Sequence, residues 1–391
     1  MRITIFNLPI YISLICLAGW LLVACQSEPA TDSLDEPISL VPLEEEYDES
    51  PAPWGFIDKT GAIVIRGDYD EVNNFSEGLA AFREKASWGY INKKGEIAIG
   101  AQYYNAHNFE HGMAKVSNFD RKYGLVDSDG QVIIPFQYQD LSGFSEGLCA
   151  VKTKSKWGYI DMENKAIISN NFDSAKGFQD GVAIVKKEEQ YFLIDKKGKM
   201  KSGDFDKISL LNNGMYKIKV GKKYGLMNAS GQVSIEPLYS FISQIEDKTM
   251  AVKLDGEYFL RTINKKRIHV PKNDGIQYLA ADRWSYRQNG KVGILDNDGK
   301  IIMAPRFNII TPFINGYGSY QESQLWGYLD QNGKILTPAV FGLTWEFKEG
   351  LARCISREGV GFLNPDGKLA FIASNFDVRD FHEGLARIPM K

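Results

Sequence analysis

Residues 88–95 read WGYINKKG and residues 109–116 read FEHGMAKV, and these two stretches decide the fold. The first joins an aromatic, β-branched segment, which favours a strand, to a tight turn containing Asn92 and Gly95. The second joins an aromatic turn to a short apolar segment that predicts another strand. Residues 96–100 alternate in polarity and predict a strand between the two. No stretch beyond the first 25 residues shows sustained helical periodicity, so the chain is expected to be all-β.

Both stretches recur along the chain. An aromatic-Gly pair or its relic occurs ten times at intervals of 33–35 residues, a period typical of solenoids and propellers. A Phe-x-Glu-Gly anchor follows 21 residues after the pair in the clear copies. The first anchors are Trp54, Trp88, Tyr123, Trp157, Tyr191, Tyr224, Tyr258, Val292, Trp326 and Val360. The second anchors span residues 75–78, 109–112, 144–147, 178–181, 347–350 and 381–384.

Each copy predicts a three-stranded antiparallel meander followed by a connection of roughly a dozen residues. A unit of some 34 residues buries too little surface to fold alone, so the copies must stack and share a core. The anchors belong in that core, because a buried apolar slot tolerates Val292 and Val360 where other copies carry Trp or Tyr. We expect about ten such units in an open, solenoid-like stack, since ten equal blades would be many for one ring. A β-propeller-like arrangement is the alternative.

The repeated pattern W-G-[FY]-[IL]-D, turn, Gly, apolar run, Pro, then F-x-E-G-L-A resembles the WG-repeat (KWG) family of bacterial proteins. The resemblance covers residues 54–391, which form one array of ten repeats. It implies a binding scaffold and no shared enzyme activity. Copies five to eight, residues 191–306, depart most from the pattern, and two of them carry Phe192 and Phe259 in place of the Gly after the anchor.

Residues 1–24 have the features of a secretory signal peptide, with a short basic start and a long apolar run. The run ends in Leu22-Val23-Ala24-Cys25, which resembles the lipobox of bacterial lipoproteins and implies that Cys25 carries lipid. An uncleaved spanning helix is the alternative, which Pro9 disfavours. We therefore expect an exported protein anchored through Cys25 in the cell membrane or outer membrane, facing the periplasm or the surface. Gln26 is compatible with the outer membrane.

Residues 25–53 form the expected tether. Residues 26–53 carry nine acidic side chains and neither Lys nor Arg, so this segment cannot bury a core and is predicted to be a disordered stalk. The remaining residues, 54–391, hold 45 basic and 40 acidic groups. A mild excess spread over that length is not a nucleic-acid footprint, and we expect no nucleic-acid partner.

Three motifs resemble catalytic or metal sites, and each has a simpler explanation. Residues 143–147 match G-x-S-x-G, but a strand follows where a hydrolase needs a helix. Residues 127–130 and 296–299 resemble calcium loops, yet they lack the further acidic ligands of an EF-hand loop, and the equivalent turns at 58–61 and 195–198 keep only the first Asp. His107 and His111 lie four residues apart in a connection without a third ligand. We therefore expect no enzyme activity, no metal and no cofactor.

Cys149 and Cys354 are the cysteines that remain beyond the lipobox. They occupy equivalent strands six repeats apart, which is too far for a disulfide in a stacked array. The sequence predicts two free, mostly buried thiols.

A contact surface is the remaining prediction. Copies five and six are rich in Lys, and Lys217, Lys219, Lys222 and Lys223 would form a contact surface for an anionic glycan or an acidic partner. A solvated face on β edges explains the same lysines without a ligand. Trp284 and Trp345 lie off the repeat register and are either part of the contact surface or fillers of the core. The expected function is non-enzymatic binding of an unidentified envelope protein or glycan; a dedicated carbohydrate-binding module with exposed aromatics is the alternative.

Overall fold

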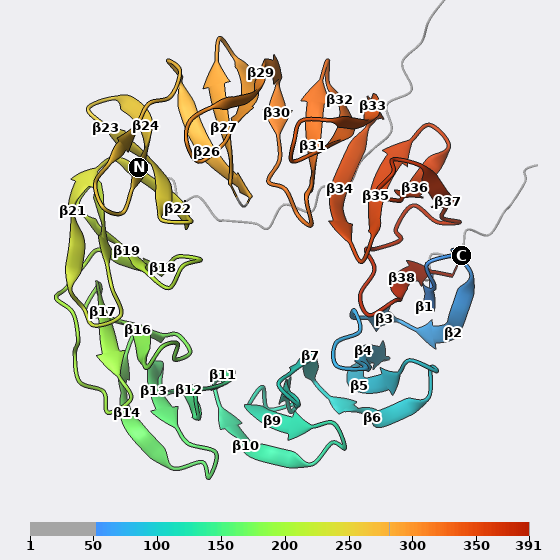
Figure 1. Cartoon of the computed structure of the whole chain (residues 1–391). Coiled ribbons are helices and arrows are strands. Elements are labelled where there is room, and N and C mark those ends of the chain that lie inside the picture. The colour runs from blue at the N-terminus through green and yellow to red at the C-terminus, as the bar shows by residue number, and fades with distance from the viewer. Residues whose placement is uncertain (1–51, 281, 391) are drawn as a thin grey trace, which may run out of the picture. The chain divides into compact units, whose positions relative to one another are not determined.

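The computed structural model describes residues 52–280 and 282–390. The signal peptide, Cys25 and the tether up to residue 51 lie outside these residues. The described residues form ten antiparallel sheets, each of three or four strands. The sheets follow one another around a ring (Figure 1). We number them as blades in chain order: blade 1 consists of β38, β1 and β2, blade 5 of β15–β17, and the others of four consecutive strands each.

The strands occupy four positions within a blade, from the middle of the ring outward. The first strands are β3 (Glu71–Val72), β7 (Asn105–Glu110), β11 (Asp140–Ser145), β15 (Ser174–Ala175), β18 (Lys207–Leu210), β22 (Phe241–Glu246), β26 (Gly275–Ala280), β30 (Ile309–Ile310) and β34 (Leu343–Lys348). The second strands are β4 (Leu79–Glu84), β8 (Met113–Ser117), β12 (Leu148–Thr153), β16 (Val182–Lys187), β19 (Tyr216–Val220), β23 (Thr249–Leu254), β27 (Arg283–Gln288), β31 (Tyr317–Glu322), β35 (Leu351–Ser356) and β38 (Ala386–Pro389).

The third and fourth strands complete each blade. The third strands are β1 (Trp54–Ile57), β5 (Ser87–Asn92), β9 (Tyr123–Asp127), β13 (Lys156–Ile160), β17 (Gln190–Asp195), β20 (Lys223–Met227), β24 (Glu257–Thr262), β28 (Lys291–Leu295), β32 (Leu325–Asp330) and β36 (Gly359–Leu363). The fourth strands are β2 (Ile63–Tyr69), β6 (Ile97–Tyr103), β10 (Val132–Tyr138), β14 (Ala166–Phe172), β21 (Val233–Tyr239), β25 (Arg267–Ile268), β29 (Ile301–Phe307), β33 (Ile335–Phe341) and β37 (Leu369–Ile372). Figure 1 shows β11 and β18 towards the middle of the ring and β10 and β14 at its outside.

The predicted three-stranded unit is wrong in one respect, because the expected connection is itself a strand. In blade 3 this segment, β7, pairs with β8 through Asn105↔Ser117 and Phe109↔Ala114. Each sequence repeat therefore supplies the two outer strands of one blade and the two inner strands of the next. The blades are offset from the repeats by half a unit.

The expected open stack is also wrong, and the propeller-like alternative is confirmed. The last strand, β38, pairs antiparallel with the first, β1, from Trp54↔Pro389 to Ile57↔Ala386. Blade 1 is thus built from both ends of the repeat array, and its pairing closes the ring. The half-unit offset makes this possible, because it leaves an inner strand, β38, unpaired at one end and two outer strands, β1 and β2, at the other.

The core lies between the blades rather than inside any one of them. Ten clusters of buried apolar side chains each join two neighbouring blades, including blades 10 and 1. Each cluster holds one repeat anchor. The aromatic anchors are half-buried, as Trp88 is, whereas Val292 and Val360 are buried. The anchors therefore stabilise the contacts between neighbouring blades, because each unit of a repeat protein buries its apolar surface against the next unit.

The Gly after each anchor has a steric cause. The pairing of β5 with β6 passes from Trp88↔Tyr103 to Tyr90↔Ile99, so the outer strand bulges opposite Gly89. A Cβ on Gly89 would lie 2.5 Å from the carbonyl oxygen of Ile99. The equivalent carbonyl approaches the equivalent glycine in six other blades. The repeated Trp-Gly pair is thus explained by the close approach of the bulged outer strand.

The two copies that lack this glycine lack the bulge as well. In blade 7 the outer strand β25 has two residues, which pair without a bulge with Leu260 and Arg261 of β24 and do not reach Phe259. In blade 5, where Phe192 replaces the glycine, the outer segment makes only isolated bridges at Phe205 and Met200. A side chain fits at Phe192 and Phe259 because no bulged carbonyl occupies the space.

The Phe-x-Glu-Gly turns link neighbouring blades along one rim of the ring. In blade 2, Glu77 and Gly78 have φ values of 53° and 82°, as in a tight hairpin turn with both central residues left-handed. The Glu77 carboxylate accepts hydrogen bonds from the backbone N–H groups of His111 and Gly112 in the next blade, at 2.7 and 2.8 Å. We call this contact a turn latch. It accounts for Glu at a position where a left-handed conformation would favour Asn or Gly.

Candidate functional site

The inner strand of blade 6, β18, lies between two cavities. One cavity of about 350 Å³ opens between blades 6 and 7 and is lined by Lys207, Lys217 and Lys219 together with Tyr224 and Phe241. The other cavity, of about 570 Å³, opens between blades 5 and 6 and shares Lys207 and the residues that follow it. Both volumes fall within the range of roughly 300–1,000 Å³ that is usual for small-molecule sites. The basic copies predicted from the sequence therefore surround two hollows beside β18.

Lys207 and Lys219 stand directly opposite each other in the pairing of β18 with β19. The equivalent position pairs Glu71 with Arg83 in blade 2 and Asp140 with Lys152 in blade 4. Like charges directly opposite each other in a sheet are destabilising. Among the nine blades whose first strand is described, blade 6 is the one that has two like charges at this place.

Lys217 extends from the second strand of blade 6 towards blade 7. Its ammonium donates to the carbonyl oxygen of Ile242 at 3.1 Å and lies 5.8 Å from the ring centre of Tyr224. Burial, followed by the charge of Lys207, lowers the pKa of Lys217. Both effects disfavour the charged ammonium, which no carboxylate lining the cavity compensates.

The same arrangement occurs between blades 3 and 4, but there the charge is paired. Lys115 occupies the position of Lys217, lies 4.5 Å from the ring centre of Tyr123, and forms an ion pair with Asp140 at 2.5 Å. Asp140 and Phe241 share one register position, since they face Lys152 and Lys253 on the second strands of blades 4 and 7. In blade 7 Phe241 therefore stands where blade 4 supplies the carboxylate.

The other predicted contact lysines lie outside the cavity. Lys222 and Lys223 are exposed at the hairpin between β19 and β20, and neither lines the cavity. Asp206, next to Lys207, accepts the N–H of Gly221 at 2.6 Å and does not line the cavity either. Two of the four predicted lysines, Lys217 and Lys219, line the cavity. The structure adds Lys207 to the same lining.

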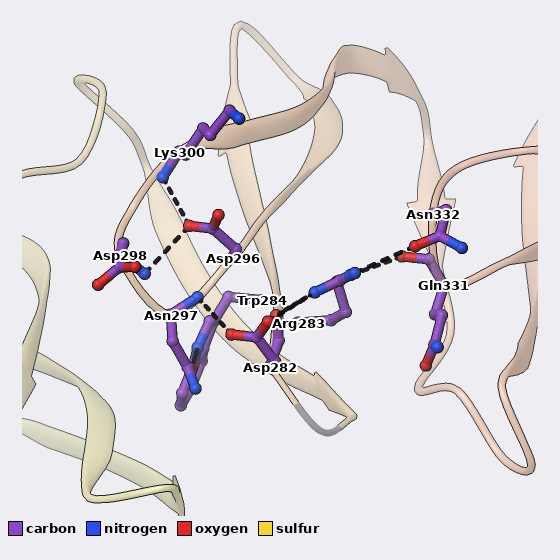
Figure 2. Close-up of polar contacts among 9 residues, drawn as sticks. All are labelled: Asp282, Arg283, Trp284, Asp296, Asn297, Asp298, Lys300, Gln331 and Asn332. Atoms are coloured by element: carbon purple, nitrogen blue, oxygen red, sulfur yellow. Dashed lines mark hydrogen bonds and ion pairs between the residues drawn. The ribbon is translucent and has the colours of Figure 1, made fainter.

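Trp284 does not belong to a contact surface, because it is fully buried between blades 7 and 8. Its indole N–H donates to the Asn297 side-chain oxygen at 2.7 Å, and the Asn297 N–H donates to Asp282 at 3.0 Å (Figure 2). Of the two alternatives for Trp284, filling of the core is therefore the one that holds. The extra Trp fills the interface between blades, and Asn297 satisfies its one polar group.

Arg283, next to Trp284, connects blade 8 to blade 9. Its guanidinium donates to the carbonyl oxygen of Gln331 at 2.7 Å and to the Asn332 side chain at 3.1 Å (Figure 2). Asp282 accepts from the same guanidinium at 3.0 Å. This contact joins neighbouring blades along the rim of the turn latches, so Arg283 has a structural role here.

Trp345 is half-buried on β34. The Arg353 guanidinium lies 4.0 Å from the ring centre, and Arg353 also pairs with Asp380 at 3.0 Å. The ring therefore contacts an arginine whose charge is already paired. Nothing in this arrangement brings Trp345 near the lysines of blade 6.

The motifs that resembled catalytic or calcium sites are repeat turns. Ser145 of the G-x-S-x-G match donates to the Phe178 carbonyl oxygen of the next blade, and Glu146 forms a turn latch with Gly181. The Asp127 carboxylate accepts from two backbone N–H groups of its own turn, at 3.1 and 2.8 Å. Asp296 does the same at 3.0 and 2.8 Å. These side chains are engaged by the hairpins themselves, as Asx turns require.

The remaining candidate residues are dispersed. Cys149 and Cys354 are free and buried in blades 4 and 10, and burial raises the pKa of each thiol to about 11. His107 lies on β7, and His111 lies in the following turn, where Glu77 accepts its N–H. In the part of the chain that the structure describes, no group of three His, Cys, Asp or Glu side chains could hold a metal ion. The same residues include no helix that is long and apolar enough to span a bilayer.

Comparison with known sequences gives one family. The sequence profile of a family described as WG containing repeat matches eight segments, which together cover more than half of the chain. The matches leave out the seventh and tenth copies. No curated protein sequence matches the chain significantly. The matched segments are residues 54–85, 88–120, 123–157, 157–191, 191–224, 224–258, 293–324 and 326–353.

Solved structures of low sequence identity are also similar to this chain. A crystal structure of the eukaryotic initiation factor covers 73% of this chain and 95% of its own, with 11% identity and a TM-score of 0.46. BamB from Moraxella catarrhalis covers 86% of this chain and 96% of its own, with 11% identity and a TM-score of 0.35. The computationally designed Ika8 protein covers 68% and 93%, with 10% identity and a TM-score of 0.34.

Proposed function

This chain belongs to the WG-containing repeat family, and we propose that it is a lipid-anchored protein of the cell envelope whose ring binds an envelope protein or glycan without catalysis. In this proposal Cys25 carries the lipid, and the acidic residues 26–53 hold the ring away from the membrane. The ring then offers a rigid surface to a partner.

The binding role rests on one observation: the charges of blade 6 depart from those of the other blades. Lys207 and Lys219 face each other where the other blades with a described first strand have opposite charges, one charge or none. Lys217 extends into the same cavity, which no carboxylate lines. Uncompensated charge lowers stability, so its presence in a hollow favours a binding role over a purely structural one.

A dedicated carbohydrate-binding module with exposed aromatics is the second candidate. Trp284 gives it no support, because its ring is buried. Phe119 and Tyr104 are exposed, by 58% and 41%, and their rings lie 6.0 Å apart. These two side chains, rather than the tryptophans, are the ones to test for sugar stacking.

The anchoring is tested by fractionation with and without globomycin, an inhibitor of lipoprotein signal cleavage. We expect the natural chain in the membrane fraction and Cys25→Ala as an unprocessed precursor. Identical behaviour of the two chains would mean that the protein is anchored through an uncleaved helix or secreted free. The acidic segment would then have no role as a stalk.

The binding role is tested by capture of envelope components on the full chain, in detergent, followed by identification of the captured species. We expect a specific partner that is lost when Lys207, Lys217 and Lys219 are all changed to Met. The matched control changes Lys222 and Lys223 to Met, because both lie outside the cavity. Equal loss in both variants would indicate a diffuse charge effect instead of a site.

A further inference from the structure

We propose that the cavity between blades 6 and 7 binds an acidic saccharide, with its phosphate or carboxylate held by Lys207, Lys217 and Lys219. This inference rests on the proposed binding function and names the ligand class and the site. It goes beyond the general contact surface, because it excludes Lys222 and Lys223 and adds Lys207.

The charge of the ligand follows from the comparison of two equivalent interfaces. Between blades 3 and 4, Asp140 neutralises Lys115 within the protein. Between blades 6 and 7, Phe241 takes the place of Asp140, and Lys217 donates only to the Ile242 carbonyl oxygen among the contacts of the described residues. An anion from outside would restore the missing charge. It would also reduce the repulsion between Lys207 and Lys219.

The type of side chain indicates an anion of phosphate or carboxylate size. Lysine ammonium groups are compact point charges that can pair with single oxygens of either anion, whereas bidentate recognition would favour arginine. Burial and Lys207 lower the pKa of Lys217, so a bound anion would raise it again. Binding is therefore expected to take up protons at alkaline pH.

The sugar part follows from the remaining lining. Ser209, Ser240 and Gln244 provide hydroxyl and amide groups, and Tyr224 and Phe241 provide rings in the same cavity. Hydroxyl and amide groups can pair with sugar hydroxyls, while the rings can contact the apolar face of a sugar. An acidic peptide could pair with the lysines, but it would not need the hydroxyl groups, amide groups and rings that line the same cavity.

The two cavities beside β18 indicate a ligand longer than one residue. They share Lys207, Ser209 and Leu210 and have volumes of about 350 and 570 Å³. The second cavity is also lined by Val182, Ile184 and Tyr216 and thus is more apolar. A chain that places its anion at Lys217 can continue past Lys207 towards blade 5.

The test is titration calorimetry on the full chain in detergent, with defined probes. A hexose 6-phosphate and a hexuronic acid disaccharide represent the two sources of charge. The neutral hexose and inorganic phosphate separate the sugar from the anion, and a polyglutamate peptide represents an acidic protein. We expect saturable binding of at least one acidic sugar, no binding of the neutral hexose, and weaker binding of phosphate and peptide.

Two variants locate the site. Lys217→Met should lower affinity for the acidic sugar by about tenfold or more. Phe241→Asp should do the same by supplying the carboxylate that blade 4 has naturally, and circular dichroism should show that the ring is intact. Lys222→Met should leave affinity unchanged. Unchanged affinity in both Lys217→Met and Phe241→Asp would overturn the assignment.

The remaining outcomes separate this inference from the wider proposal. If no acidic sugar binds but the chain still captures an envelope partner, the ligand class is wrong and the scaffold function stands. Stronger binding of polyglutamate than of either sugar would also overturn the saccharide and indicate an acidic protein. If neither sugars nor envelope components bind, both proposals fail.

Discussion

The carboxylate of Glu383 accepts a hydrogen bond from the backbone N–H of Gly78, 305 residues earlier in the chain, at 3.0 Å. The same carboxylate pairs with Lys93 at 3.0 Å. Glu383 lies in the turn before β38, so these bonds fix the C-terminal strand to the second blade. The contact has the geometry of an ordinary turn latch. The ring is thus closed by the same interaction that joins its consecutive blades.

Loss of the closing latch should loosen the C-terminal strand. For Glu383→Gln we expect a fall of about 1 kcal/mol in the free energy of unfolding, because the hydrogen bond from Gly78 loses its charged acceptor and the ion pair with Lys93 is lost. Amide hydrogen exchange of residues 386–389 should accelerate. The matched control is Glu77→Gln, which breaks a latch inside the array and should leave that exchange unchanged. Equal exchange in the two variants would show that the latch has no part in closure.

The turn latches also predict a dependence of stability on acid. For Glu349, partial burial alone would raise the pKa, but the Gly384 N–H and Lys59 outweigh it and the pKa is lowered. The pKa of Glu383 is lowered in the same way, with Lys93 and the Gly78 N–H outweighing burial. A carboxylate with a lowered folded-state pKa stabilises the fold above its unfolded pKa and loses that effect as pH falls through the folded value.

Urea unfolding should therefore show a steady loss of stability as pH falls below about 4. A variant with both Glu349→Gln and Glu383→Gln should be less stable at neutral pH and should lose less on acidification. An unchanged slope in that variant would assign the acid sensitivity to other carboxylates.

The glycine after the anchor gives a sharp steric prediction. Gly89→Ala places a Cβ 2.5 Å from the Ile99 carbonyl oxygen, too close for two unbonded atoms, so the outer strand must move. We expect a loss of about 2–3 kcal/mol in the free energy of unfolding, as for overpacked cores. Gly100→Ala in the same blade is the control, because a Cβ there meets nothing within 4 Å. Similar stability of the two variants would refute the bulge as the cause of the Trp-Gly pattern.

Trp284 should matter for stability and not for binding. Trp284→Ala is expected to lower the free energy of unfolding by about 3–5 kcal/mol, because it empties a buried site and leaves the Asn297 oxygen without its donor. Trp284→Phe should cost less, since it keeps most of the ring volume. The Phe variant should capture envelope components as well as the natural chain does. A loss of capture without a matching loss of stability would show that Trp284 contributes to the contact surface.

The buried thiols should be unreactive in the folded ring. Burial raises the pKa of both Cys149 and Cys354 to about 11, so at pH 8 only about one thiol in a thousand is ionised. Alkylation at pH 8, read by peptide mass spectrometry, should label these two cysteines slowly without denaturant and quickly in urea. Rapid labelling of one under native conditions would indicate local opening of its blade.

Much of this fold could be predicted from the sequence, because local chemistry repeats with the period. The Asn92 turn forms as expected, with its side chain accepting the N–H groups of Lys94 and Glu96 at 2.9 and 3.1 Å. Closure could not be predicted in this way. The pairing of β1 with β38 depends on the small rotation between blades, summed over the whole array, and no local pattern encodes that sum.

The first strand of each blade was missed for a different reason. In β7 the residues Asn105, His107 and Asn108 are polar, and only Ala106 and Phe109 are buried, so the apolar alternation that marks a strand is broken. The candidate site was found in part. The density of lysine in copies five and six pointed to blade 6, but the register that sets Lys207 against Lys219 comes only from the fold.

The half-unit offset between repeats and blades has a consequence for how such rings change size. A duplicated stretch of 34 residues adds two inner and two outer strands, which complete one more blade, and the joint between β1 and β38 is left as it was. Neither end of the array needs a special terminal unit to shield an open face, unlike the ends of a solenoid. Duplication of one repeat inside the gene would therefore leave both sides of the seam unchanged, and the larger ring would close once the rotation between its blades had decreased.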